Sequence, residues 1–482
     1  MRLIRSALAV VALFSIAPAA KAAPPNVVFI LVDDLGWADV GCYGGEAFQT
    51  PNIDRLAAGG VRFTDFYAAC PVCSPTRASI QSGQYQTRLR ITDFIPGHYR
   101  PFERLTVPYN ADHLPLAVET PAELLAAADY TPGYFGKWHL GNPPGRQPAE
   151  QGYNVSEVFS GHQVPRRPKP GQKPEYATDY MARRAGEFIA DHKDGPFFLF
   201  LSPYAVHIPL QAKPETVAKY EERLGGQSGP EGPLPSPIYA AMVEHVDDMV
   251  GSVVASLDEH GLTDDTLVIF TSDNGGLYKM YTGAGDRVTD NGPLRGEKGT
   301  LYEGGIRVPL IAKWPGVAEA GAECEEPAIS IDFWPTLAQA AGVGPNNQTQ
   351  LIDGVSLLPL LTDPDATLNR EAIFWSYPHY HHMDPAAAVR SGRHKLIRHF
   401  EDDSVELYDL EADLSETNDL AADMPEKASE LNQLLDGFLA ETDALLPEEN
   451  DRFDAARRGE WWSRRTGKPL KSQDTAWARP KR

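Results

Sequence analysis

Three continuous apolar segments lie along the chain, at 26–32, 197–201 and 266–271. Most of their positions carry branched or aromatic apolar side chains, and polar residues do not alternate with them. A strand inside a parallel sheet is buried on both faces and shows such an unbroken run, whereas a half-exposed strand alternates. The pattern therefore predicts three central strands of a parallel sheet.

Amphipathic segments lie between and around these strands. Helices are expected at about 52–58 and 122–128, because a Thr-Pro pair stands before each and favours a helix start. A longer helix is expected at 239–257, where apolar residues recur at helical spacing. Alternating strands and helices are typical of α/β folds. We therefore predict a mostly parallel central sheet flanked by helices.

The pattern changes near residue 375. Short segments at 387–390, 394–399 and 404–407 are joined by turns and predict antiparallel strands, and 427–441 predicts a helix. Together these elements indicate a smaller C-terminal α+β subdomain, with an antiparallel sheet and one helix, packed on the main domain.

The two ends of the chain differ from its body. Residues 1–22 begin with a basic region, continue with an apolar run and end in Ala20-Lys21-Ala22. This is the pattern of a cleaved signal peptide, too short to span a membrane, so we predict a secreted or periplasmic protein without a membrane span. The predicted parts are a signal peptide at 1–22, a catalytic domain at 23–375, the antiparallel subdomain at 376–450 and a tryptophan-containing tail at 451–482.

The chain has a formal charge of −22, from 66 acidic and 44 basic residues. This excludes general binding of nucleic acid, which needs a basic surface. The tail at 451–482 has the opposite sign, with ten basic and four acidic residues. We hypothesise that it either folds back onto the acidic body or helps to hold an anionic ligand.

Two of the predicted strands run into acidic pairs. Asp33 and Asp34 directly follow the first strand, and Asp273 and Asn274 lie just beyond the third. The carboxyl ends of parallel strands share one edge of the sheet, so these side chains are expected to converge. Oxygen ligands on a rigid platform suit Ca²⁺ or Mg²⁺ better than zinc. Asp and Asn also open ordinary turns after strands, so each pair alone could be structural.

Cys73 opens a segment that is compatible with the N-terminus of a helix, with a proline in its first turn and a glycine at its end. The helix dipole and free N–H groups favour anions there, and Arg77 lies one turn further along. Two other interpretations stay open. Cys73 could form a redox pair with Cys70 in a Cys-x-x-Cys motif, or a structural disulfide with Cys42 or Cys324.

The segment Cys-x-Pro-Thr-Arg, with a glycine six residues beyond the arginine, resembles the signature of type I sulfatases. These are the formylglycine-dependent sulfatases of the alkaline phosphatase superfamily. One such match would be weak evidence, but four further motifs resemble those of the family in the same order. They are Leu31–Gly36, Gly136–Gly141, Thr271–Gly275 and Gly296–Pro309. The resemblance covers about residues 26–410 and implies an alkaline phosphatase-like fold.

This resemblance implies a modified cysteine beside a metal ion. Cys73 would be oxidised by a formylglycine-generating maturation enzyme to 3-oxoalanine, or formylglycine, whose hydrate is the nucleophile. Asp33, Asp34, Asp273 and Asn274 would hold one Ca²⁺ together with the modified residue 73.

The remaining catalytic roles also follow from the resemblance. Arg77 would hold the hydrate, and Lys137 and Lys298 would bind sulfate oxygens. One hydroxyl would attack sulfur, and His207 with Lys298 would protonate the leaving alkoxide. His139 would then take the proton of the second hydroxyl, which expels sulfate and restores the aldehyde.

An aromatic and histidine-rich run at 374–382 precedes the short strands of the subdomain. Such side chains suit sugar faces and hydroxyls, so His379, and after it His381, are predicted substrate contacts. An ordinary packed strand at the domain junction would show the same composition. With the predicted export, the run favours a sulfatase that acts on a sulfated polysaccharide or its oligosaccharides.

Three other functions compete with this prediction. The enzyme could be an arylsulfatase of small substrates, or a phosphodiesterase or phosphonate hydrolase of the same superfamily. The sequence lacks the second Asp- and His-rich metal cluster that would favour phosphoryl transfer. A non-catalytic exported glycan-binding protein is disfavoured, because the nucleophile and both candidate histidines are present.

Overall fold

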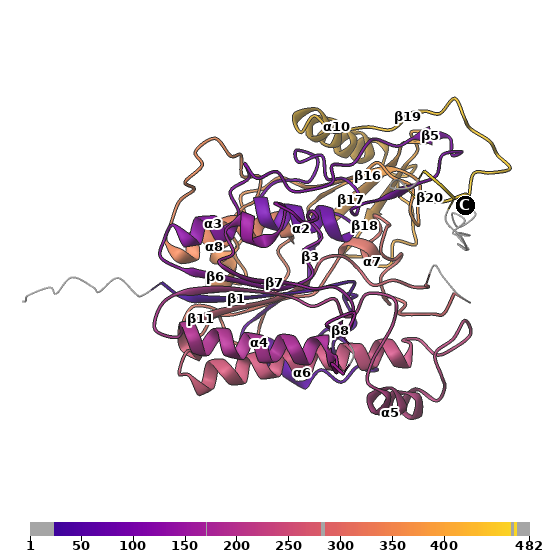
Figure 1. The fold of residues 1–482 in the computed structure, drawn as a ribbon. Helices are drawn as coiled ribbons and strands as arrows, with labels where there is room; N and C mark the ends of the chain where they lie inside the picture. The colour runs from indigo at the N-terminus through magenta and orange to yellow at the C-terminus, as the bar shows by residue number, and fades with distance from the viewer. Residues whose placement is uncertain (1–23, 170, 281–284, 464–466, 470–482) are drawn as a thin grey trace, which may run out of the picture.

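The computed structural model describes residues 24–169, 171–280, 285–463 and 467–469. A large mixed sheet with helices on both faces makes up most of the protein (Figure 1). A smaller antiparallel sheet with one long helix packs beside it, above the sheet in that view. The predicted α/β class is therefore confirmed. The predicted signal peptide lies outside the described residues.

The central sheet is mostly parallel. Its neighbouring strands all run parallel, except that β12 is antiparallel to both β11 and β2. In order across the sheet the strands are β13 (Ala322–Cys324), β2 (Val61–Phe63), β12 (Leu310–Lys313), β11 (Thr266–Ser272), β1 (Asn26–Val32), β10 (Phe197–Ser202), β6 (Thr131–Gly136) and β7 (Val155–Val158). The three apolar runs are thus the adjacent strands β10, β1 and β11 at its centre.

Strand β1 shows why these runs are apolar throughout. All of its residues are buried, and alternate side chains enter two different cores. Val27, Phe29 and Leu31 face one core, and the residues between them face the other. Both faces of the strand are therefore removed from water, as expected for a parallel sheet covered on both sides.

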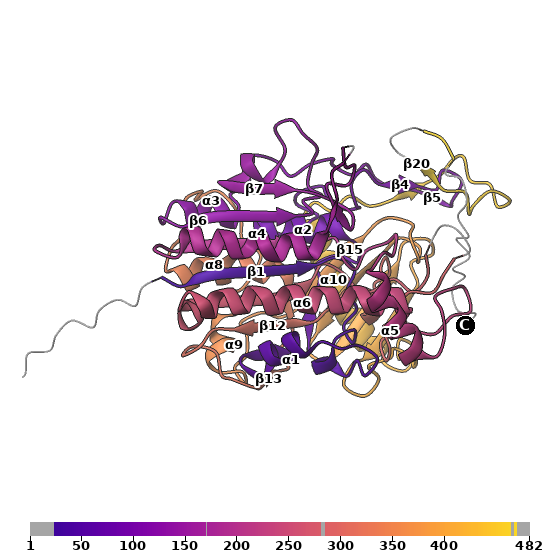
Figure 2. The ribbon, with the colours of Figure 1, turned by 60° about the horizontal axis from the view of Figure 1, so that its bottom comes forward.

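Helices cover both faces of the sheet (Figures 1 and 2). One face is covered by α1 (Pro51–Ala58), α4 (Ala177–His192) and α6 (Pro237–Glu259), with α5 (Pro214–Leu224) packed on α6. The other face is covered by α2 (Cys73–Ser82), α3 (Pro121–Ala126) and α8 (Phe333–Ala341), with α9 (Leu358–Thr362) packed on α8. The three predicted helices are present as α1, α3 and α6.

Helix α3 is shorter than the sequence suggested. The predicted helix ran to residue 128, but α3 ends at Ala126. Thr120 and Glu123 cap its start reciprocally, as the sequence favoured. Asp129 then takes a left-handed conformation, with φ of 65°, as the chain turns into β6. The helix therefore ends before this turn into β6.

The C-terminal subdomain contains four antiparallel strands, one more than predicted. The strands β15 (Ile373–Tyr377), β16 (Ala386–Ser391), β17 (His394–His399) and β18 (Val405–Asp409) follow one another in the sheet, and α10 (Pro425–Glu441) packs against them. β15 comes from the aromatic run at 374–382 and crosses the boundary placed between residues 375 and 376. The sheet begins at Ile373, while the domain division itself stays a prediction.

The described part of the C-terminal tail folds back onto the body. Just before the tail, β19 (Glu448–Glu449) pairs with β5 (Leu105–Thr106), and within the tail β20 (Trp462–Ser463) pairs with β4 (His98–Tyr99). Figure 2 shows β20 beside β4 and β5 at one edge of the molecule. Much of the basic charge of the tail lies at 464–466 and 470–482, outside the described residues.

The remaining elements are short. Among the described residues they comprise two further strand pairs, four turns of 3₁₀ helix and one further helical turn. These are β3 (Phe66–Tyr67) with β14 (Ala328–Ile329), β8 (Gln163–Val164) with β9 (Glu175–Tyr176), the 3₁₀ turns Gly41–Tyr43, Pro148–Gln151, Thr263–Asp265 and Ser330–Asp332, and α7 (Glu303–Ile306). Within the described ranges, no helix has the length and apolarity needed to cross a bilayer.

Candidate active site

The two acidic pairs meet at the carboxyl edge of the central sheet. Val32 of β1 is in register with Ser272 of β11, so the residues that follow them lie side by side. The backbone N–H of Asp34 donates to Asp273 Oδ1 at 3.2 Å. The side chains of Asp33, Asp34, Asp273 and Asn274 are all essentially buried, at 2% exposure or less. The convergence predicted from the strand ends is present.

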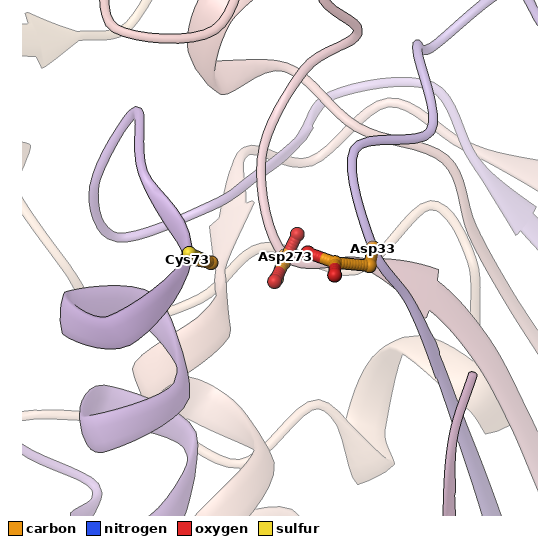
Figure 3. A group of neighbouring side chains, drawn as sticks. All are labelled: Asp33, Cys73 and Asp273. Atoms are coloured by element: carbon orange, nitrogen blue, oxygen red, sulfur yellow. The ribbon is translucent and has the colours of Figure 1, made fainter. Parts of the chain in front are cut away.

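Cys73 faces this acidic group from the N-terminus of α2. Figure 3 shows its side chain at the start of the helix, with the carboxylates of Asp33 and Asp273 across from it. One ligand atom of each of these three residues lies within 4.8 Å of the other two. Helix α2 ends at Gly83, whose φ of 69° is left-handed and suits glycine. The sequence therefore predicted the helix and the place of Cys73 at its start.

His139 contacts the sulfur of Cys73. Its Nδ1 lies 3.1 Å from Sγ, and its Nε2 lies 2.5 Å from the carbonyl oxygen of Ile95. Because a carbonyl only accepts, the proton of the neutral ring sits on Nε2 and Nδ1 keeps its lone pair. Burial first, then Lys137 and Arg77, hold the pKa of His139 well below its ordinary value. His139 thus presents the lone pair of Nδ1 to the sulfur of Cys73.

Three cationic side chains are paired with the three carboxylates. Lys137 Nζ lies 2.6 Å from Asp33, and Lys298 Nζ lies 2.7 Å from Asp34. Arg77 donates from Nε to Asp273 at 2.8 Å. All three cations are buried, at 3–5% exposure. The motif residues of five separated segments therefore form one cluster, in which formal charges balance.

The carboxylates of this cluster influence one another. Burial, with the charges of Asp33 and Asp34, raises the pKa of Asp273 to about 6, although Arg77 opposes this. Burial also works against ionisation of Asp34, but Lys298, His207 and Lys137 outweigh it and lower its pKa. Of these two carboxylates, Asp273 is thus the one whose ionisation is made less favourable, as expected where like charges share a site.

Asn274 supplies evidence for a metal site. Its Nδ2 donates to Asp34 Oδ1 at 2.8 Å and to the carbonyl of Gly275 at 2.9 Å. Its Oδ1 is buried and has no hydrogen-bond partner. Buried polar atoms are rarely left unmatched, and an amide oxygen beside carboxylates is a normal ligand for a hard cation. The residues present therefore fit a Ca²⁺ or Mg²⁺ ion.

His207 reaches the same cluster from the loop after β10. Its Nε2 lies 3.6 Å from Asp34 Oδ2, while Nδ1 lies 2.5 Å from the carbonyl of Ile208. Burial and Lys298 lower its pKa to about 3. His162 Nε2 lies 3.1 Å from the carbonyl of His207 and so helps to hold the loop. His207 and Lys298 thus both lie against the carboxylate of Asp34.

Sequence reasoning missed several residues that support this cluster. Ser202 accepts a hydrogen bond of 2.6 Å from Arg77 Nη1. Ser202 ends β10 at the same edge as the acidic pairs, so the strand-end argument could have found it. Ser74 donates to the carbonyl of His139 at 2.9 Å. The ring of Tyr204 lies beneath the Lys137 ammonium, 5.6 Å from its centroid. No pattern in the sequence pointed to Ser74 or Tyr204.

The two predicted substrate contacts lie outside the ion cluster and are buried. His379, 1% exposed, places Nε2 2.8 Å from Thr92 Oγ1. His381, 3% exposed, packs its ring against the backbone of Gly299, next to Lys298. The ring of His381 therefore lies beside the Lys298 segment of the site.

All four cysteines are free. Neither a Cys70–Cys73 redox disulfide nor a structural disulfide is formed. Cys70 is fully buried, and burial raises its thiol pKa well above the ordinary value. This is the character of a core residue rather than of a reactive thiol.

The chain matches two protein-family models. The model described as Sulfatase matches residues 25–343, and the model described as N-sulphoglucosamine sulphohydrolase, C-terminal, matches residues 296–442. The second match begins at the Lys298 segment and extends through the whole of α10.

Known proteins show the same similarity. The chain is 35% identical over 414 residues to human arylsulfatase A, covering 78% of this chain and 75% of that protein. It is 30% identical over 513 residues to a sulfatase of Formosa agariphila, covering 87% and 89%. The crystal structure of Ps i-CgsB in complex with k-i-k-neocarrahexaose superposes with a TM-score of 0.73 at 28% identity, covering 90% and 96%. These comparisons confirm the alkaline phosphatase-like fold.

Proposed function

The chain belongs to the sulfatase family and hydrolyses sulfate esters, and on this premise we propose a specific nucleophile, metal and substrate class. The nucleophile is formylglycine made from Cys73, the metal is one Ca²⁺, and the substrate is a sulfated polysaccharide or its oligosaccharides. This chain's similarity to sulfatases supports the resemblance on which the individual roles depend.

The observation that carries the proposal is the position of Cys73. Its side chain faces the carboxylates of Asp33 and Asp273, yet a soft thiolate is a poor partner for a hard cation held by oxygen. Burial also raises the pKa of the Cys73 thiol, so that it stays protonated. Oxidation of the CH₂SH group to an aldehyde by the maturation enzyme would remove both conflicts, because its hydrate offers two hydroxyl oxygens.

The proton-transfer roles follow from atoms that already face residue 73 or Asp34. His139 Nδ1 is assigned as the base that accepts a proton from the hydroxyl group at residue 73. Lys298 and His207 are assigned to the leaving oxygen, since both lie on Asp34. With a pKa of about 3 the His207 ring is neutral, so we assign the resting proton to Lys298, with His207 as its partner.

The anion-binding roles fall to the other cations. Lys137 is assigned to a sulfate oxygen, and Arg77 to the group at residue 73, which stands one helical turn before it. The Ca²⁺ would be held by Asp33, Asp34, Asp273 and Asn274 and would supply charge that draws in and orients the anionic ester. Ca²⁺ rather than Mg²⁺ is proposed from the family resemblance.

A sulfated glycan is proposed as the substrate for two reasons. The similar structure of Ps i-CgsB holds k-i-k-neocarrahexaose, an oligosaccharide. The histidine-rich run also lies against the Lys298 segment, where the group that carries the sulfate would be bound. We propose that His379 and His381 contact this sugar through the edges of their rings, since both are almost fully buried.

Export through the signal peptide at 1–22 remains part of the proposal. It would bring the enzyme to extracellular or periplasmic polysaccharide. N-terminal sequencing of the protein recovered from the medium or periplasm checks this, and a mature chain that begins at Ala23 is expected. An uncleaved N-terminus on exported, active enzyme would contradict it.

Mass spectrometry of the peptide that contains Cys73 tests the nucleophile. Protein made in a host with the maturation enzyme should show a formyl group in place of the thiol, and Cys73→Ala should release no sulfate. Active enzyme with an unmodified Cys73 would overturn the assignment. A matched Cys70→Ala variant should keep both the modification of Cys73 and the activity, because Cys70 lies in the core.

A panel of substrates tests the glycan proposal. Human arylsulfatase A, at 35% identity, favours a second candidate, an arylsulfatase of small substrates. Sulfate release from one class of sulfated oligosaccharide, with a kcat/KM well above that for an aryl sulfate, is the expected result. Cleavage of aryl sulfates with no activity on any sulfated glycan would favour the second candidate instead.

A further inference from the structure

Lys298 stands in a short loop that two consecutive histidines hold from one side. His382 Nδ1 lies 3.1 Å from Glu297 Oε1, on the residue before the lysine. His381 lies against Gly299, the residue after it, so closely that a Cβ at Gly299 would fall 2.1 Å from Nδ1. Gly299 also has a φ of 83°. The histidine pair therefore contacts the residues on both sides of Lys298, at the carboxylate of Glu297 and at the backbone of Gly299.

His381 is in turn held by residues distant in the sequence. Arg100 Nη2 donates to the carbonyl of His381 at 3.0 Å. The ring of Trp461 meets the His381 ring edge-on, with centroids 5.9 Å apart. The guanidinium of Arg100 lies over the Trp461 ring, 4.3 Å from its centroid. Arg100, His381 and Trp461 thus form a three-membered cluster beside the Lys298 loop, in which Arg100 stacks on Trp461 and His381 meets Trp461 edge-on.

The C-terminal segment brings Trp461 to this position. Residues 448–463, which we call the C-terminal clasp, dock onto the loop at 98–106. Asn450 Nδ2 donates to the carbonyls of Pro101 and Glu103 at 3.0 and 2.7 Å. Trp461 is 5% exposed. An aromatic ring buried against a cation gains both apolar burial and a cation–π contact, which fixes the geometry of the stack.

Trp462, the next residue, provides a natural contrast. It is half-buried, and its Nε1 donates to Glu460 at 3.1 Å. Its ring lies 5.8 Å from that of Phe102. It therefore shares the clasp with Trp461, but its Nε1 and its ring contact the clasp and its docking loop.

We propose that Trp461 is a positioning residue for Lys298, acting through His381 and Arg100. The inference deepens the proposed function and rests on it. A lysine side chain has four rotatable bonds, so the place of its ammonium depends on how firmly its backbone is held. Displacement of a catalytic group by about 1 Å can cost about 100-fold in rate. The clasp, far from Lys298 in sequence, thereby completes the active site.

The test compares Trp461→Ala with Trp462→Ala in the purified, formylglycine-containing enzyme. Kinetics are measured on a small aryl sulfate and on the best sulfated oligosaccharide. Trp461→Ala should lower kcat about tenfold or more on both substrates, with KM changed less than about threefold. Trp461→Phe should restore most of the loss, and Trp462→Ala should stay within about twofold of the wild type.

Several results would overturn the inference. These are an unchanged kcat in Trp461→Ala, an equal loss in Trp462→Ala, or a loss confined to the glycan, which would indicate direct contact with sugar. If Trp461→Ala does not fold, Arg100→Met is judged by the same criteria, since it removes the bond to His381 and the stack on Trp461. Failure of the proposed function would differ, because the wild type itself would release no sulfate.

Discussion

Two clusters of largely buried charge have the same numbers of carboxylates and cations and a different organisation. Each contains three carboxylates and three cations. The active-site cluster consists of Asp33, Asp34, Asp273, Arg77, Lys137 and Lys298, and the second, which we call the interface cluster, consists of Asp65, Glu303, Glu416, Arg307, Arg390 and Lys395. The interface cluster joins the catalytic body to strands β16 and β17 of the C-terminal sheet.

The interface cluster separates its negative charges. Lys395, which is fully buried, lies between Glu303 and Glu416 at 2.8 and 2.9 Å. The second oxygen of Glu303 accepts from Tyr67 at 2.7 Å, and the second oxygen of Glu416 accepts from the backbone of Glu303 at 2.7 Å. Every oxygen of these two carboxylates has a donor from within the chain. The arrangement is complete without a ligand.

The active-site cluster gathers its negative charges instead. Asp33 and Asp273 face one space, where Cys73 also points, and the amide oxygen of Asn274 is unmatched. Burial and neighbouring carboxylates raise the pKa of Asp273 to about 6, but burial and Glu303 also raise the pKa of Glu416 to about 7, so a raised pKa does not separate the two clusters. Total charge and burial are therefore poor indicators of function. What distinguishes the reactive cluster is like charges directed at a common point, with an oxygen left over for a cation.

Neutralising one carboxylate in each cluster tests the difference between them most directly. Asp273→Asn should lower sulfatase activity by about 10³-fold or more, because a proposed metal ligand and the partner of Arg77 are lost. Glu416→Gln should keep activity within about twofold, since it touches no reacting group. Sulfate release and thermal unfolding are measured for both. Retention of activity in Asp273→Asn would contradict the assignment of the site.

The second prediction concerns Lys395→Met. Removing this cation leaves Glu303 and Glu416 buried without their shared partner, so the free energy of unfolding should fall by about 3–5 kcal/mol. Denaturant titration measures the loss. At low temperature the folded fraction should keep its kcat.

The control for that variant is Lys427→Met. Lys427 is partly exposed and pairs with Glu430 on the surface of α10, so the cost should be below about 1 kcal/mol. Equal effects of the two variants would show that burial of Lys395 adds nothing.

The third prediction concerns His399, whose charge is also balanced by partners within the chain. Burial lowers the pKa of its ring, but Asp384 and Glu406 outweigh this and raise it to about 9. Folding therefore stabilises the protonated ring. This contribution is fully present below about pH 6.5 and is lost as pH rises through about 9, on the order of 3 kcal/mol.

Denaturant titrations at several pH values check this. His399→Gln should flatten the fall in stability between pH 6.5 and 9. His394→Gln, at the other end of β17, should leave the fall in place. A wild-type stability that does not change across this range would contradict the paired state of His399.

The smallest expected effect is that of added metal. Ca²⁺ at 100 times its Kd should stabilise the folded enzyme by about 2.7 kcal/mol, and a chelator should reverse the shift in Tm. Asn274→Ala should weaken this response, since it removes the unmatched oxygen. Glu416→Gln should leave the response unchanged. No shift with either Ca²⁺ or Mg²⁺ would contradict a cation site.

Local sequence patterns predicted the centre of the fold. The runs that became β1, β10 and β11 are apolar because both faces of those strands are covered, and this leaves a signal in each segment alone. The same argument placed the acidic pairs at one edge. The family resemblance added the lysines and histidines, which converge on the cluster as a group of motifs would suggest.

Other features had no local signal. The aromatic run at 374–382 fits either a sugar-binding surface or a packed strand, because both have this composition, and its first part lies in β15. The burial of His379 and His381 depends on the loop at 92–106 and on the Lys298 segment, which the chain supplies from elsewhere. The composition of a segment limits the contacts that its side chains can make, but the surrounding structure decides which of these contacts form.

The sequence by itself determined the strands, the reactive helix start and the residue types of the active site, because each depends on a few neighbouring positions. Only the tertiary structure decided the proton position on His139, the pairing of each lysine with one carboxylate, and the docking of Trp461 behind Lys298. These depend on contacts between segments distant along the chain. Such contacts are set by packing and burial of the whole molecule, which no local pattern records.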